Sequence, residues 1–270
     1  MQPLHLVRTF ACVAVLALAV SAGTVAGETL AVRHMEGIVH GFLVLRAMDG
    51  TRLASGDLIQ TASGERVTSR LIFRFSDGSI HDEIAVFSQR RRFRLLSYHL
   101  ARKGPMFPQP LEMAIDCQSG QVTIRYSEEQ GEQKTESEHM DLPPDLANGI
   151  VVTLLKNLHA GESPPAFPIV VATPKPRLIK LMASTAGQDT FSVGGSARKA
   201  THYILRPEMG GLGELVASLA GREPAAVHVW IHPGEAPVFI KSEGPLYPGG
   251  PVWRIELTSP TWSQQRPAHK

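Results

Sequence analysis

Apolar and polar residues alternate along most of the chain, in short runs that end in turn-forming residues. Residues 66–75 show the pattern clearly, because Leu71, Phe73 and Phe75 would lie on one face of a strand and Arg74 on the other. Asp-Gly and Ser-Gly pairs follow such runs about every 8–12 residues, a spacing typical of all-β proteins. The expected strands cover residues 38–47, 52–61, 66–75, 80–88, 95–103, 111–117, 121–128, a hairpin over 128–138, and then 167–172, 178–183, 190–193, 200–205, 226–232, 238–242 and 252–258.

One segment, residues 145–158, follows a period of 3.6 instead of 2. Asp145 comes after two prolines and is the expected N-cap, since its carboxylate can accept hydrogen bonds from the first turn. A second, weaker helix is expected over residues 210–220. The apolar stripe of the first helix comprises Ile150, Val151, Leu154, Leu155 and Leu158.

The pattern predicts a mostly β fold, in which a long, curved antiparallel sheet forms a half-open β-barrel wrapped around one helix. The helix stripe would then either complete a packed core or cover an apolar cavity. Both arrangements need the same stripe, so the sequence leaves them open.

Residues 1–27 have the features of a secretory signal peptide. Arg8 precedes an apolar run over residues 10–20, and small residues follow over 21–27. The run is shorter than the roughly 20 residues that span a bilayer, which disfavours an uncleaved anchor. We therefore expect a periplasmic or secreted protein with no transmembrane span after cleavage, consisting of one half-barrel domain over residues 28–258 and a flexible tail over 259–270.

Charge and cysteine content narrow the possible partners. The formal net charge is +2, which gives no electrostatic case for binding nucleic acid. Cleavage would leave Cys117 as the only cysteine, so the mature chain could form no internal disulfide. We expect Cys117 to be a buried or turn-adjacent residue instead of a reactive thiol.

Catalytic and metal-binding motifs are missing from the sequence, which contains no nucleophile elbow, P-loop, H-E-x-x-H or Cys-x-x-Cys motif. His228 and His232 fall on an expected strand, where they would lie roughly 13 Å apart. In the triplet that begins at His81, only His81 and Glu83 would share a face. No metal, cofactor or catalytic residue is predicted, and a hydrolase with a dispersed site is kept as an alternative.

Two exposed segments suggest surface roles. Residues 89–94 carry four arginines, which could bind an anionic head group but are more typical of a solvated strand end. The acidic residues 128–138 are expected to form a solvated hairpin without a metal site. Met106 and Phe107 lie between prolines in an extended loop and look exposed, so they could dock a partner.

The order of these parts resembles a family of uncharacterised periplasmic half-barrel proteins, similar in shape to the lipoprotein carriers LolA and LolB. The resemblance covers most of residues 36–258, through the segments RLIFRFSDGSIHDEIAVF, DLPPDLANGIVVTLLKNL and VHVWIHPGEAPVFIKSEG. Its C-terminal strand-pair motif comprises Trp230, Ile231, Pro237, Val238 and Ile240. The resemblance implies an apolar interior suited to acyl chains, and it transfers no catalytic or binding residue.

We therefore expect an exported, non-enzymatic protein that binds or carries an apolar or amphiphilic, lipid-like molecule inside the half-barrel. One alternative is a structural or interaction protein of the cell envelope, with a filled core and an envelope protein as its partner. The other is the hydrolase. The expected ligand-lining residues are Phe73, Phe75, Ile150, Val151, Leu154 and Leu155.

Overall fold

The computed structural model describes residues 29–128, 131–159, 161–193, 196–208 and 224–258. The predicted signal peptide, the predicted tail and the second predicted helix lie outside these residues. Within the described part of the chain, no helix has the length and apolar content needed to cross a bilayer.

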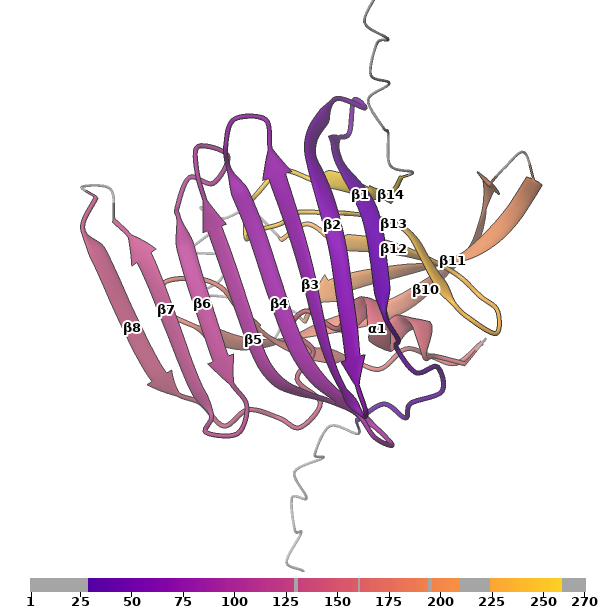
Figure 1. The fold of residues 1–270 in the computed structure, drawn as a ribbon, viewed down its shortest axis with the longest axis horizontal. Coiled ribbons are helices and arrows are strands. Elements are labelled where there is room, and N and C mark those ends of the chain that lie inside the picture. Colours follow the sequence, from indigo (N-terminus) through magenta and orange to yellow (C-terminus); the bar gives the residue numbers. More distant parts are fainter. Residues whose placement is uncertain (1–28, 129–130, 160, 194–195, 209–223, 259–270) are drawn as a thin grey trace, which may run out of the picture.

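A single antiparallel sheet of 14 strands forms the body of the molecule. Each strand pairs with its neighbours in sequence, except that β1 pairs with β14 and joins the run β1–β8 to the run β9–β14. Figure 1 shows the two runs facing each other, with α1 between them. The sheet is curved but not closed, because β8 and β9 are its two ends, and this confirms the predicted mostly β fold around one helix. The strands are β1 Val39–Ala47, β2 Arg52–Ser63, β3 Arg66–Phe75, β4 Ile80–Gln89, β5 Phe93–Lys103, β6 Leu111–Asp116, β7 Gln121–Ser127, β8 Gln133–His139, β9 Phe167–Val171, β10 Arg177–Val193, β11 Ser196–Pro207, β12 Val227–His232, β13 Val238–Gly244 and β14 Trp253–Leu257.

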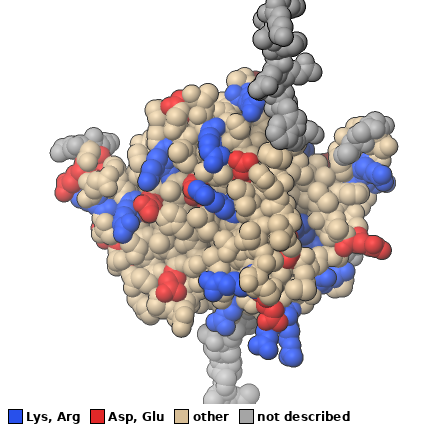
Figure 2. All heavy atoms as spheres, viewed as in Figure 1, with Lys and Arg blue, Asp and Glu red and all other residues tan. Residues whose placement is uncertain are grey.

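Strand alternation separates an apolar inner face from a charged outer one. On β4, Ala85 and Phe87 are buried, whereas Asp82 points to the other face and accepts two hydrogen bonds from Arg70 of β3, at 2.8 and 2.6 Å. Lys and Arg are interspersed with Asp and Glu on the face seen in Figure 2. The curved sheet therefore turns its apolar side inward, as the period of 2 predicts.

Strand β10 differs from its predicted form. Two short strands were expected, over residues 178–183 and 190–193, but β10 is continuous over Arg177–Val193. Its register with β11 shifts between Thr185 and Gly187, a bulge that lets the strand bend without ending. Small and polar residues in the middle of this strand hide its continuity in the sequence.

The helix α1 is much shorter than predicted. It covers only Val151–Lys156, and its N-cap is Ile150, which makes no side-chain capping bond. The prediction that Asp145 caps the helix is therefore wrong. Asp145 lies well before the first helical turn, and its buried Oδ1 atom has no hydrogen-bond partner among the residues that the structure describes.

A loop anchored to β9 replaces the first half of the predicted helix. The Ala147 amide donates to the Pro168 carbonyl at 2.8 Å. The Asn148 side chain donates to the Val170 carbonyl and accepts from the Val170 amide, both at 2.8 Å. Gly149 has a φ of 71°, which a helix does not accommodate, so the helix can start only after it.

Two apolar clusters fill much of the interior. The larger one surrounds α1 and includes the buried Ile150, Leu154 and Leu155. The smaller one includes Phe73 and Phe75 of β3 and also Phe107, Trp253, Leu43, Leu45 and Ala54. Phe107 is only 3% exposed and meets the Phe75 ring edge-on at 5.5 Å, so the prediction that Phe107 is exposed is wrong, whereas Met106 is partly exposed.

The segment before β1 crosses the end of the helix. Leu30 accepts from the Phe93 amide at 2.9 Å. The amides of Arg33 and His34 both donate to Asn157 Oδ1, at 2.8 and 2.7 Å. These bonds position Glu36, two residues after His34, against the C-terminal end of α1.

Candidate binding cavities

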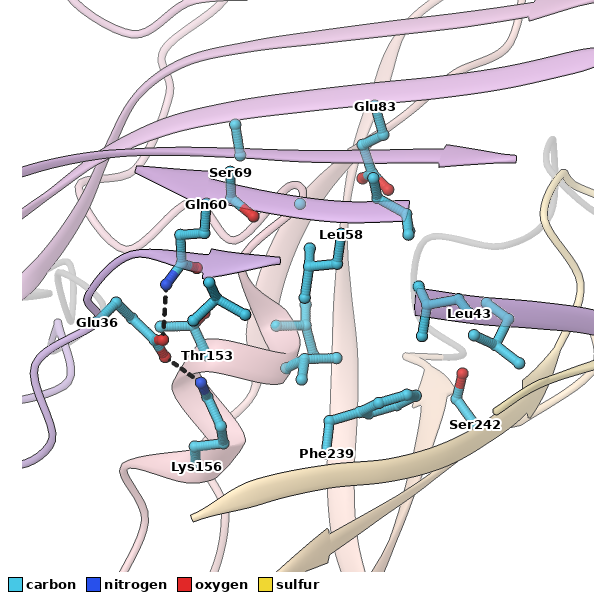
Figure 3. Close-up of a pocket in the computed structure, with 17 residues that line it drawn as sticks. Glu36, Leu43, Leu58, Gln60, Ser69, Glu83, Thr153, Lys156, Phe239 and Ser242 are labelled. Carbon is cyan, nitrogen blue, oxygen red and sulfur yellow. Dashed lines mark hydrogen bonds and ion pairs between the residues drawn. The ribbon is translucent and has the colours of Figure 1, made fainter. Parts of the chain in front are cut away.

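A first cavity, of about 310 Å³, lies between α1 and the strands β1–β4, β13 and β14. Its walls draw on both apolar clusters, and Phe239, which packs against both, is one of its lining residues. Figure 3 shows Leu43, Leu58 and Phe239 facing this space. Its main apolar lining residues are Leu43, Leu58, Leu71, Val151, Phe239 and Ile255.

One end of the first cavity is polar and internally paired. The Glu36 carboxylate forms an ion pair with Lys156 of α1 and accepts from the Gln60 amide at 2.9 Å (Figure 3). The Glu36 backbone also exchanges two hydrogen bonds with the Gln89 side chain, at 2.7 and 2.9 Å. The Glu36 side chain is only 7% exposed, and this buried carboxylate is satisfied within the chain.

A second cavity, of about 410 Å³, lies on the other side of the loop before α1. Apolar residues of β5, β6, β9 and β10 line it, together with the loop between β13 and β14. Glu83, Gly149 and Val151 line both cavities, so the two adjoin at these residues. Gly149 is needed there, because a Cβ at this position would lie 2.9 Å from Ala85 Cβ and 3.0 Å from Tyr98 Cε2.

A buried polar group lies at the boundary between the cavities. The Tyr98 hydroxyl donates to Glu83 Oε1 at 2.8 Å, and His81 Nε2 lies 3.9 Å from Glu83 Oε2. Burial opposes ionisation of Glu83, but His81, the Tyr98 hydrogen bond and the charge of Arg102 together hold the Glu83 pKa below its usual 4.5. Burial and the neighbouring carboxylate raise the pKa of Tyr98 well above 10.0, so its hydroxyl stays protonated and can donate.

Arg102 lines the second cavity and is 4% exposed. Its Nη2 atom donates to the Ala172 carbonyl at 3.0 Å, and Nη1 makes a longer contact of 3.5 Å with the Leu246 carbonyl. The Nε atom is buried, and none of the described residues accepts a hydrogen bond from it. Burial lowers the pKa of Arg102 to about 10, so the guanidinium remains charged at neutral pH.

The structure distributes the six expected lining residues over different parts of the interior. Val151 lines both cavities. Ile150, Leu154 and Leu155 pack in the larger apolar cluster, away from these two cavities. Phe73 and Phe75 pack in the smaller cluster.

The hydrophobic pattern of the sequence did not identify several residues that line the first cavity. Leu71 shares the inner face of β3 with Phe73, so alternation alone places it on the cavity side. Leu58 and Phe239 come from β2 and β13, which lie far apart in the sequence and approach each other only through the pairing of β1 with β14. No local pattern could have brought these two residues together.

The other candidate residues from the sequence, three of its histidines, Glu83 and Cys117, lie as follows. His81 and Glu83 do converge on one face of β4, as predicted. His228 lies on strand β12, and its Nδ1 atom is 2.8 Å from His202 Nε2 of β11. Among the described residues, no group of three or more His, Cys, Asp or Glu side chains is placed to hold a metal ion. Cys117 is partly buried, and burial raises the pKa of its thiol to about 11, which disfavours the reactive thiolate.

Comparison with known proteins assigns the chain to no family. No model of a known protein family matches the chain, and no curated protein matches it. Among solved structures, it is similar to the crystal structure of a beta-barrel-like protein of the domain of unknown function DUF1849 from Brucella abortus. The two are 9% identical, and the match covers 84% of this chain and 98% of that chain with a TM-score of 0.47. At this identity and score, the similarity assigns no function to the chain.

Proposed function

We propose that this chain is an exported, non-enzymatic protein that binds an apolar or amphiphilic, lipid-like molecule inside its half-barrel. The single observation that carries the proposal is the pair of adjoining, mainly apolar cavities on either side of Gly149 and Val151. Their volumes fall within the range of roughly 300–1,000 Å³ that is typical of small-molecule sites.

The chemistry of the walls favours an alkyl chain over a polar solute. Leu58, Leu71 and Phe239 offer no hydrogen bonds to a polar ligand. An alkyl chain packed against these side chains would be removed from water, together with the apolar surface that it covers. Each buried methylene contributes about 0.8 kcal/mol, so a chain of about ten carbons would gain roughly 8 kcal/mol before the cost of ordering it. An acyl chain therefore supplies enough free energy to bind without any covalent chemistry.

Export rests on the predicted signal peptide over residues 1–27. The resemblance to half-barrel carriers such as LolA and LolB remains an expectation from the sequence, and it agrees with an envelope location. A protein in that compartment encounters lipid fragments and fatty acids, which match the cavity chemistry.

The test uses the full-length chain, expressed with its leader and purified without detergent. We expect native mass spectrometry to find a bound amphiphile, and a dansyl-labelled fatty acid to bind and to be displaced by the unlabelled acid. Leu58→Trp, which places an indole in the first cavity, should weaken probe binding by about tenfold or more. The N-terminal mass of the exported protein would check cleavage near residue 27.

The matched control is Ile59→Trp. Ile59 is the next residue on β2 and is 40% exposed on the opposite face, so its replacement should leave probe binding unchanged. If the wild type carries no lipid and does not bind the probe, the interior works as a scaffold and the carrier proposal fails. Equal effects of both substitutions would place probe binding elsewhere.

A further inference from the structure

The second cavity contains a buried cation without a matching anion. Among the described residues, no carboxylate lies within 4.0 Å of the Arg102 guanidinium, whose two contacts are the backbone carbonyls of Ala172 and Leu246. A buried charge is costly unless an opposite charge or a full set of hydrogen bonds compensates it. Arg102 has neither, since its Nε–H has no partner within the described part of the chain.

Glu83 contributes a carboxylate to the lining of this cavity, but that carboxylate is already engaged. Glu83 accepts from the Tyr98 hydroxyl and lies beside His81, on the boundary with the first cavity. It influences Arg102 only through its charge, which favours the protonated guanidinium without forming an ion pair with it. Donor capacity therefore remains open on Arg102, at its Nε–H.

The surroundings of Arg102 suit the head of an amphiphile. The Tyr247 ring lies 5.9 Å from the guanidinium carbon and covers one side of it. Leu100, Met113, Ile169 and Leu181 line the same cavity and present only apolar surface. A ligand with one anionic end and a long apolar body would match both features.

We propose that Arg102 binds the anionic head group of a single-chain amphiphile, a carboxylate or a phosphate, whose alkyl chain lies along the apolar wall toward Val151 and the first cavity. This inference rests on the proposed function and names its ligand class. The planar guanidinium fork forms paired hydrogen bonds with carboxylate and phosphate oxygens, which an ammonium group cannot match. At 4% exposure, Arg102 would hold the head away from water, where a charged hydrogen bond is strongest.

The test compares three ligands of equal chain length on the full chain: dodecanoate, dodecyl phosphate and dodecanol. Isothermal titration calorimetry at neutral pH should show that the wild type binds at least one of the two anions about tenfold or more tightly than the alcohol. A hydrogen bond to a charged group contributes enough binding free energy to produce this difference. The ranking of the two anions then distinguishes a fatty acid head from a phosphate head.

Arg102→Met should abolish the preference, because it should weaken binding of the anions far more than binding of dodecanol. The control is Arg94→Met on the same strand, where the side chain is exposed, and it should keep the wild-type preference. Arg102→Lys keeps the charge and tests the fork, and it should retain only part of the preference. Far-ultraviolet circular dichroism confirms the fold of each variant.

The outcomes separate the two proposals. If the wild type binds dodecanol as tightly as both anions, or if Arg102→Met still prefers an anion, then the head-group assignment is wrong and the carrier function stands. If the wild type binds none of the three ligands, both are wrong. If Arg102→Met does not fold, the wild-type ranking and Arg102→Lys still decide the assignment.

Discussion

Two buried charges, Glu36 at one end of the adjoining cavities and Arg102 at the other, are treated differently by the chain. Glu36 has an ion pair with Lys156 and a hydrogen bond from Gln60, so its charge is compensated within the protein. Arg102 has two backbone carbonyls and an unpaired Nε–H. The difference indicates that the Glu36 carboxylate holds the N-terminal segment against α1. The Arg102 guanidinium, in contrast, is available to the proposed anionic ligand.

Breaking the ion pair between Glu36 and Lys156 should have the largest effect on stability. Glu36→Gln removes the charge that compensates Lys156, and we expect it to lower the free energy of unfolding by about 3 kcal/mol. Arg102→Met should change it by less than about 1 kcal/mol, because the burial cost of an uncompensated cation disappears together with two carbonyl contacts. Urea unfolding followed by tryptophan fluorescence measures both.

Glu65→Gln is the control for that comparison. Glu65 is 55% exposed and lies 3.5 Å from Arg90, an exposed ion pair that should contribute less than about 1 kcal/mol. Equal losses for Glu36→Gln and Arg102→Met would mean that both charges are structural. That result would remove the contrast between the two ends.

The wall between the ends should be the next most sensitive place. Gly149→Ala forces a side chain into a backbone conformation with φ of 71° and brings its Cβ to 2.9 Å from Ala85. We expect a loss of about 2 kcal/mol in the same unfolding assay. Gly64→Ala is the control, since its φ of 58° is similar but nothing lies within 4 Å of the added Cβ.

The difference between the two glycine variants isolates the contact with the sheet from the backbone strain. If Gly64→Ala costs as much as Gly149→Ala, the close approach at the cavity wall has no energetic weight. The loop before α1 would then be free to move apart from β4 and β5.

The smallest effect concerns pH. The pKa of Glu83 is lowered in the folded protein, so its contribution to stability is fully present above the unfolded value of 4.5 and is lost as the pH falls through the folded value. Glu83→Gln should therefore flatten the decline in stability below about pH 4.5 relative to wild type. Urea midpoints across this window, measured for wild type and for Glu83→Gln, give the two slopes.

The strands were largely predictable because each carries its own alternation. Residues 66–75 were predicted as a strand and form β3 with those bounds. The same rule placed His81 and Glu83 on one face of β4, which the 3.9 Å separation confirms. The alternation of apolar and polar residues along a strand determines which face of the sheet each side chain occupies. A short stretch of sequence is enough to show this alternation.

The helix bounds and the cavities were not predictable in this way. The predicted helix began at residue 145, ahead of the apolar stripe that starts at Ile150. Contacts with β9 keep residues 145–149 out of the helix, and a local pattern cannot predict these contacts because they depend on tertiary structure. The importance of Arg102 had a weak local signal, because it lies two residues after the buried Leu100 and so shares the inner face of β5. The folded structure is needed to see that its Nη atoms contact two carbonyls while its Nε–H has no partner among the described residues.

The bonds between the loop and β9 also bear on how the sheet ends. In an antiparallel ladder, alternate residues turn their amide and carbonyl groups away from the neighbouring strand, and on β9 these include Pro168 and Val170. Proline has no amide hydrogen, its carbonyl accepts from Ala147, and both groups of Val170 are bonded to the Asn148 side chain. A second molecule thus finds no free ladder to extend there, and the amide of a single asparagine protects an apolar terminal strand from lateral association into fibres.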